Sequence, residues 1–237
     1  MIKRSMTVVA LGLLTVLVFA NVAYADFTPV FTLETSNTVI NGNPEVKIHM
    51  EFDEEDEEIG NFKMTIPKGF IIAGDDQIPE VPASPPAPLG KEGEEIGSGT
   101  ITIEGGLACR PGPEGGIPLS TAVNIDATLY ERTRTDDEID AGVHAVWFLD
   151  IEPLNRVRLL VKGSPLTGWT VEGAPTPSDN TCNPLVVDIT INAQSESGVP
   201  LITNRPKPGK VTFLAEIASQ DSPTVAMFTH QVVLTKV

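Results

Sequence analysis

Histidine, serine and cysteine side chains are the first place to look for chemistry in this sequence, and they are sparse. The three histidines, His49, His144 and His230, lie in separate strand-like stretches. A histidine-based metal site or catalytic triad would therefore need distant strands to meet, and we expect polar sheet histidines instead. The sequence contains no G-x-S-x-G, H-E-x-x-H or P-loop motif. These observations predict a non-catalytic protein.

Two acidic runs, at residues 53–58 and 136–140, are the sharpest local features. Both fall between expected strands, where charged tips are usually just solvated, and we favour that interpretation. Calcium is the alternative, because it prefers several hard oxygen ligands. Neither run has the D-x-D-x-D-G spacing of a calcium loop. The calcium candidates are Asp53, Glu54, Asp56, Asp136 and Asp137.

A carboxylate-dependent hydrolase is a further alternative, because so acidic a chain can always supply two carboxylates. Glycosidases need such a pair in a cleft that binds sugar. Aromatic residues make up only 5% of this sequence. Trp147 is expected in the core because its strand is apolar. Trp169 could be a ligand platform or a core residue, and we favour the core.

The two cysteines, Cys109 and Cys182, both lie in Gly- or Pro-containing, loop-like settings. An isolated pair in an oxidising compartment most often forms a disulfide. Closing so long a loop would stabilise the fold by about 4 kcal/mol. No C-x-x-C spacing or nearby histidine supports a metal site or a reactive thiol.

The N-terminus predicts export. Lys3 and Arg4 precede an apolar run over residues 7–20, and Ala23 and Ala25 occupy the −3 and −1 positions of a cleavage site before Asp26. The run is too short to span a bilayer, so we expect a signal peptide over residues 1–25 and no transmembrane segment after cleavage. We expect a secreted or extracytoplasmic protein, at a bacterial cell surface, in the periplasm or in the medium.

The charge balance narrows the class of partner. The formal net charge is −16, and cleavage of the signal would remove two positive charges. Such a chain is unsuited to nucleic acid and to anionic membranes, which need Lys and Arg. An envelope or extracellular partner is expected.

The hydrophobic period is two throughout the mature chain, which indicates β-strands. Twenty glycines and twenty prolines interrupt every candidate helix. We predict an antiparallel β-sandwich, or two small sandwiches in series, with few or no helices. The regions are residues 26–104, with a Pro-rich loop at 79–90, and residues 105–237, packed with the first. The stretches with apolar residues at every second position are 46–52, 62–66, 123–129, 157–161, 185–191 and 211–217, and residues 142–151 are apolar on both faces, as in a central strand.

Several short segments resemble a known module. Asn43-Pro44 before a strand, and the Ile66-Pro67-Lys68-Gly69-Phe70 segment after the next, are similar to the opening of a repeated all-β module of large secreted and surface proteins of actinobacteria and related bacteria. Residues 95–101 and 201–206 resemble two later motifs of that module. The resemblance implies an all-β surface or secreted module of unassigned activity, and it supplies no catalytic residues.

The sequence as a whole favours a non-catalytic secreted or cell-surface β-sandwich with a structural, adhesion or ligand-binding role. The alternatives are a secreted hydrolase such as a glycosidase and a calcium-dependent adhesion module.

Overall fold

The computed structural model describes residues 27–52, 59–74, 76–77, 93–103, 123–151, 155–175, 184–219 and 224–236. Four predicted features lie outside the described residues. They are the signal peptide with its cleavage site at Ala25 and Asp26, the acidic run at 53–58, the Pro-rich segment at 79–90, and the cysteines Cys109 and Cys182.

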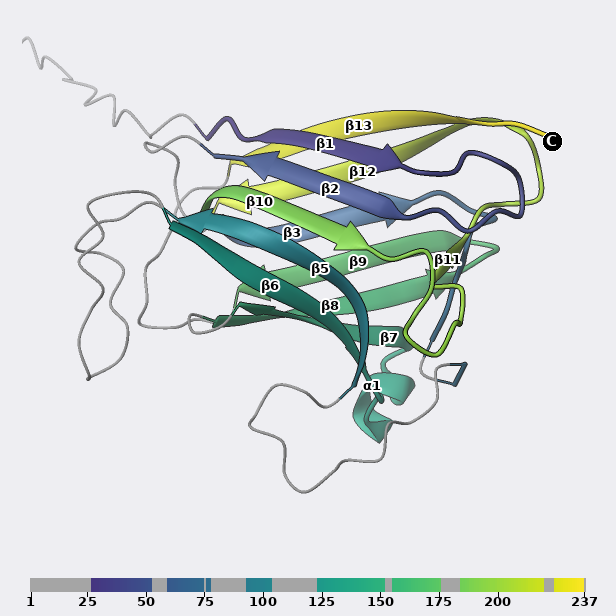
Figure 1. Ribbon diagram of the computed structural model, residues 1–237, viewed down its shortest axis with the longest axis horizontal. Helices are drawn as coiled ribbons and strands as arrows, with labels where there is room; N and C mark the ends of the chain where they lie inside the picture. Colours follow the sequence, from purple (N-terminus) through teal and green to yellow (C-terminus); the bar gives the residue numbers. More distant parts are fainter. Residues whose placement is uncertain are drawn as a thin grey trace, which may run out of the picture.

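Within the described ranges the chain forms thirteen strands and one short helix (Figure 1). Most strands cover the stretches where apolar residues alternate with polar ones, because alternation places one face in a core. In chain order the elements are β1 Val30–Thr35, β2 Val46–Glu51, β3 Ile59–Ile66, β4 Ile71–Ile72, β5 Glu94–Ile103, β6 Val123–Arg132, α1 Asp136–Asp140, β7 Val143–Ile151, β8 Asn155–Ser164, β9 Gly168–Pro175, β10 Pro184–Ile191, β11 Ile202–Thr203, β12 Gly209–Ser219 and β13 Val225–Leu234.

Eleven strands form one large antiparallel sheet in the order β1-β2-β10-β5-β6-β7-β8-β9-β3-β12-β13. The two short strands β4 and β11 pair separately. The sheet curls strongly, so that β1, β2, β10, β5 and β6 face β13, β12, β3, β9 and β8 across the interior (Figure 1). Strands of residues 26–104 and of residues 105–237 interleave, since β10 lies between β2 and β5.

The prediction of an all-β, antiparallel fold is confirmed, but the clear two-sheet sandwich is not what these residues form. The ladder continues without a break from β6 to β7, where Leu129 pairs with Leu149. The apolar stretch at 142–151 is β7, which has a partner on each side, as predicted for a central strand. The result is a single sheet, nearly closed on itself.

The core lies inside this curl and follows the predicted alternation. On β12 every second residue from Val211 to Ile217 is buried, while the residues between them face outward. Val146 and Ala145 of β7 are both fully buried. Within the described residues no helix has the length and apolarity needed to cross a membrane.

Candidate functional site

Arginines gather on one patch of the outer surface, where β6, β7 and β8 lie side by side. The sequence has seven arginines, and four of them, Arg132, Arg134, Arg156 and Arg158, come from the end of β6, the segment after it, and the start of β8. The chain brings them together because β6, α1, β7 and β8 follow one another as antiparallel neighbours. We call these four residues the arginine cluster.

The strand register fixes which side chains share the surface with the arginine cluster. Tyr130 of β6 pairs with Phe148 of β7, which pairs with Arg158 of β8. Asp150 of β7 pairs with Arg156 in the neighbouring row. Directly opposed residues of an antiparallel ladder point to the same face of the sheet. Arg132, Arg156 and Arg158 therefore lie around the ring of Phe148, with Asp150 beside it, while Arg134 donates to the carbonyl oxygen of Val143.

Helix α1 supplies the residue that holds two of the arginines. Glu138 is buried and accepts hydrogen bonds from Arg132 Nη2 at 2.6 Å to each carboxylate oxygen. Arg158 Nη2 donates to the same carboxylate. The backbone N–H of Thr135 donates to Glu138 Oε2 at 2.8 Å, and the Thr135 hydroxyl accepts from the Glu138 N–H, which completes a capping box.

The electrostatics of Glu138 favour its ionised form. Burial by itself works against the charge, but the Thr135 N–H and the guanidinium groups of Arg158 and Arg132 outweigh it, so the pKa of Glu138 is lowered from its ordinary value. An ionised Glu138 keeps both guanidinium groups in fixed positions.

The ring of Phe148 contacts two guanidinium groups of the arginine cluster. The guanidinium carbons of Arg132 and Arg156 each lie 5.5 Å from the centre of its ring, within the range of cation–π attraction. Arg156 also forms an ion pair, with its Nη2 atom 3.6 Å from Asp150 Oδ2. The side chain of Arg158 is 45% exposed and that of Arg156 is 31% exposed. Two ordered guanidinium groups therefore reach solvent, in a geometry that suits a carboxylate, sulfate or phosphate.

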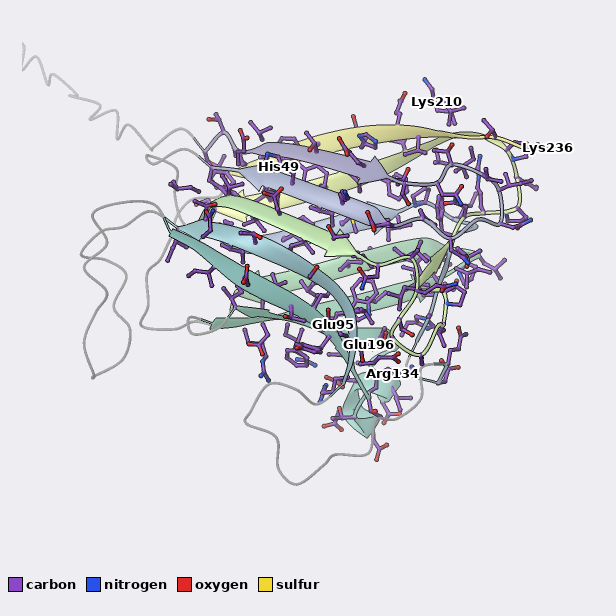
Figure 2. The ribbon with its side chains drawn as sticks, viewed as in Figure 1. His49, Glu95, Arg134, Glu196, Lys210 and Lys236 are labelled. Atoms are coloured by element: carbon purple, nitrogen blue, oxygen red, sulfur yellow. The ribbon has the colours of Figure 1, made fainter. Side chains whose placement is uncertain are left out.

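A second polar cluster lies on the outer face of β2 and β10. The imidazole of His49 is held between two carboxylates, with Nδ1 2.7 Å from Asp188 Oδ1 and Nε2 3.0 Å from Glu51 Oε1. The hydrogen bond to Asp188 raises the pKa of His49, partial burial lowers it, and Glu51 raises it further, so the net direction is upward. Figure 2 shows His49 on β2, away from α1.

His144 is held by contacts inside the protein. His144 Nε2 is 2.8 Å from the carbonyl oxygen of Ile72, and its ring lies 4.6 Å from that of Trp169. His230 is half-buried on β13. The described part of the chain contains no group of three or more His, Cys, Asp or Glu side chains arranged to hold a metal ion.

The calcium candidates are placed only in part. Asp136 and Asp137 form the exposed first turn of α1, not a loop, because Thr135 caps a helix there. Acidic residues at that position favour the helix N-terminus. Asp53, Glu54 and Asp56 lie outside the described residues.

Both tryptophans belong to the core, as predicted. Trp147 is 1% exposed and Trp169 is 2% exposed. Each indole N–H has a partner inside the protein: Trp147 Nε1 donates to Glu131 Oε2 at 3.3 Å, and Trp169 Nε1 donates to the carbonyl oxygen of Phe70 at 2.9 Å. Neither indole is available as a ligand platform.

Two buried glutamates escaped the sequence analysis. Glu94 of β5 is 4% exposed and Glu131 of β6 is 3% exposed, and they are direct register partners. The backbone N–H of Ser197 donates to Glu94 Oε1, while Glu94 Oε2 has no hydrogen-bond partner among the described residues. The alternation of β6 could have predicted the burial of Glu131, since this residue lies at every second position after Ala127 and Leu129, which are buried.

Comparison of this chain with protein-family models, with curated proteins and with solved structures finds no match. The resemblance to the repeated surface module therefore stays a prediction.

Proposed function

We propose that this chain is a non-catalytic, exported binding module, and that the arginine cluster holds an anionic group of its ligand. The observation that carries the proposal is the gathering of four of seven arginines on one patch of a chain whose net charge is −16. Export rests on the signal-like residues 1–25, and the expected location is the bacterial surface, the periplasm or the medium.

The chemistry of the cluster selects the ligand group. Guanidinium groups form paired hydrogen bonds with planar or tetrahedral oxyanions. Glu138 and Phe148 hold the arginines before any ligand arrives, which lowers the entropy lost on binding. Because the chain as a whole carries a net charge of −16, an isolated carboxylate or sulfate fits the cluster better than a dense polyanion such as nucleic acid. The ligand class is an acidic saccharide, or another envelope component with isolated anionic groups.

The test compares binding of the mature chain to immobilised oligosaccharides that are neutral, uronate-containing or sulfated. We expect binding to at least one acidic set and at least a tenfold loss for Arg158→Gln and for Arg156→Gln. Lys210→Gln is the matched control, because Lys210 is also an exposed cation but lies at the opposite end of the molecule from α1 (Figure 2). Equal binding by all three variants would contradict the proposal, as would a lack of binding to every acidic probe.

A secreted carboxylate-dependent hydrolase is the second candidate, and the Glu94–Glu131 pair is the observation that favours it. Opposed residues on neighbouring strands have Cβ atoms about 5 Å apart, so the two carboxyl groups are within reach of the separation of about 5–5.5 Å that retaining glycosidases use. Both side chains are buried, so catalysis would require the strand ends around them to open. Hydrolysis of a soluble glycan that Glu131→Gln abolishes, and Arg158→Gln leaves in place, would favour this candidate over a binding module.

A further inference from the structure

The two edge strands of the large sheet, β1 and β13, come together along one line of the molecule, which we call the seam. Among the described strands each pairs with a single neighbour, β2 for β1 and β12 for β13. The two strands run side by side in the same direction along the top of Figure 1. Across the seam the ring of Phe31 lies 5.7 Å from that of Phe228. Side chains, and not a backbone ladder, therefore close most of the seam.

One end of the seam is sealed by the backbone. The N–H of Thr235 donates to the carbonyl oxygen of Thr38 at 2.9 Å, and the N–H of Ile40 donates to the carbonyl oxygen of Thr235 at 3.0 Å. Asn204 is 2% exposed, and its amide donates to the carbonyl oxygens of Asn37 and Val39. These bonds close the sheet just beyond the ends of β1 and β13.

The other end of the seam, which we call the open end, is less buried among the residues that the structure describes. Among the inward residues of β13, Leu234 and Val232 near the seal are buried. Further from the seal, Phe228 and Ala226 are only half-buried. Outward-facing Met227 of the same strand is 65% exposed. Half-buried apolar side chains of β1 and β13 therefore lie near the surface in this part of the seam, although Phe27, just before β1, is itself buried.

The edge of β13 lacks the usual protection against pairing with another chain. Natural edge strands are guarded by charged residues, prolines, bulges or short length. Residues 225–234 contain no Asp, Glu, Lys, Arg or Pro, and their one ionisable residue is His230. They pair with β12 over ten residues without a register shift. Such an edge presents a continuous row of backbone donors and acceptors.

We propose that the open end of the seam accepts an extended segment of a partner protein, which pairs with β1 and β13 by strand addition. Because both edges run in the same direction, one inserted strand can be antiparallel to both, which is the more stable pairing. Its inward residues, at every second position, would be apolar and would meet Phe31 and Phe228. Its outward residues would be neutral or basic, because the chain is strongly acidic and Glu34 is exposed on β1.

This site is separate from the arginine cluster and does not depend on the function proposed for it. The cluster lies on β6 to β8, which are the central strands of the sheet order, whereas the seam joins the two ends of that order.

The first experiment uses a blocked ten-residue peptide in which Val alternates with Lys and Thr, and measures its binding to the mature chain by fluorescence anisotropy. The controls are the same peptide N-methylated at alternate residues and a version with Glu in place of Lys. We expect each control to bind at least tenfold more weakly. We also expect hydrogen exchange to slow at least tenfold for amides in Val30–Thr35 and Val225–Leu234. No binding at millimolar peptide, equal binding of the N-methylated peptide, or unchanged exchange would overturn the proposal.

The second experiment uses protein variants. Ala226→Lys places a charge on the inward side of β13 at the open end, and we expect at least tenfold weaker peptide binding. Ala218→Lys is the matched control, since Ala218 is also half-buried in the β12–β13 hairpin but faces outward opposite Val225, and we expect less than a twofold change. Equal effects of the two variants would overturn the proposal. A free chain that is already a stable dimer, with the seam amides protected, would overturn it in favour of a second copy.

Discussion

The sheet turns back on itself at two places, and they are held in different ways. At the α1 end, β6 and β7 are hydrogen-bonded neighbours in both sequence and space, and Glu138 ties the connecting helix to Arg132 and Arg158. At the seam, β1 and β13 come from opposite ends of the chain and share ring contacts and the seal at Thr235. A local hairpin closes a short loop at small entropic cost, whereas the seam must close almost the whole chain. We therefore expect the α1 end to be rigid and the seam to be the part that opens.

The largest expected change in stability comes from removing an aromatic side chain in each region. Trp147→Ala removes a fully buried indole beside the α1 end, and we expect a loss of about 3–5 kcal/mol in the free energy of unfolding. Phe228→Ala removes a half-buried ring at the seam, and we expect a smaller loss, about 1–2 kcal/mol, because part of the ring is already solvated. Urea denaturation of both variants measures the difference. Equal losses would mean that the seam is packed as tightly as the α1 end.

The unequal strength of the two regions could be foreseen only in part. Alternating apolar residues predicted six of the eleven strands of the large sheet, β2, β3, β6, β8, β10 and β12, and the apolar stretch at 142–151 predicted the central strand β7. Period two says which face of a strand is buried but not which strand lies next to it. It therefore gave no sign that β10 would separate β2 from β5, or that one curled sheet would replace a sandwich.

The candidate site shows the same limit. Asp136 and Asp137 drew attention because they are adjacent in sequence, whereas the four arginines belong to two segments with β7 between them. Only the pairing of β6 and β8 with β7 brings those segments together. The helix at 136–140 could have been foreseen, because Thr135 followed three residues later by Glu138 is a capping-box pattern.

The seal of the seam can be weakened by one change. Asn204→Ala removes the amide that donates to the carbonyl oxygens of Asn37 and Val39. We expect the free energy of unfolding to fall by about 1–3 kcal/mol. We also expect Asn204→Ala to accelerate hydrogen exchange of the backbone amides more in β1 and β13 than in β6 and β7. Asn192→Ala, a half-buried asparagine just after β10, is the control and should leave the exchange pattern as it is. Uniform acceleration across all four strands would contradict a seam that opens separately.

A substitution at the buried glutamates near α1 is expected to increase stability instead of lowering it. Glu94→Gln keeps the acceptor for the Ser197 N–H and replaces a buried carboxyl group, opposite Glu131, by an amide. Since the amide N–H can donate a hydrogen bond to the Glu131 side chain, we expect an increase of about 1 kcal/mol in the free energy of unfolding. Glu95→Gln, at the next and less buried position, is expected to change stability by less than half of that. A destabilised Glu94→Gln variant would mean that this end needs the carboxylate for its structure or for a bound ligand.

The smallest expected effect belongs to His49, which lies on exposed sheet between the two regions. Its pKa is raised in the folded chain by Asp188 and Glu51, so protonation stabilises the fold. This contribution is fully present below the ordinary histidine pKa of about 6.5 and is lost as the pH rises through the folded-state value. Solvent screens the partly exposed cluster, so we expect less than about 1 kcal/mol. Thermal unfolding at pH 5.5 and 8.5 should show a pH-dependent loss that His49→Gln reduces and His230→Gln does not. If both variants keep the pH dependence of the unsubstituted chain, the carboxylates around His49 do not couple its charge to folding.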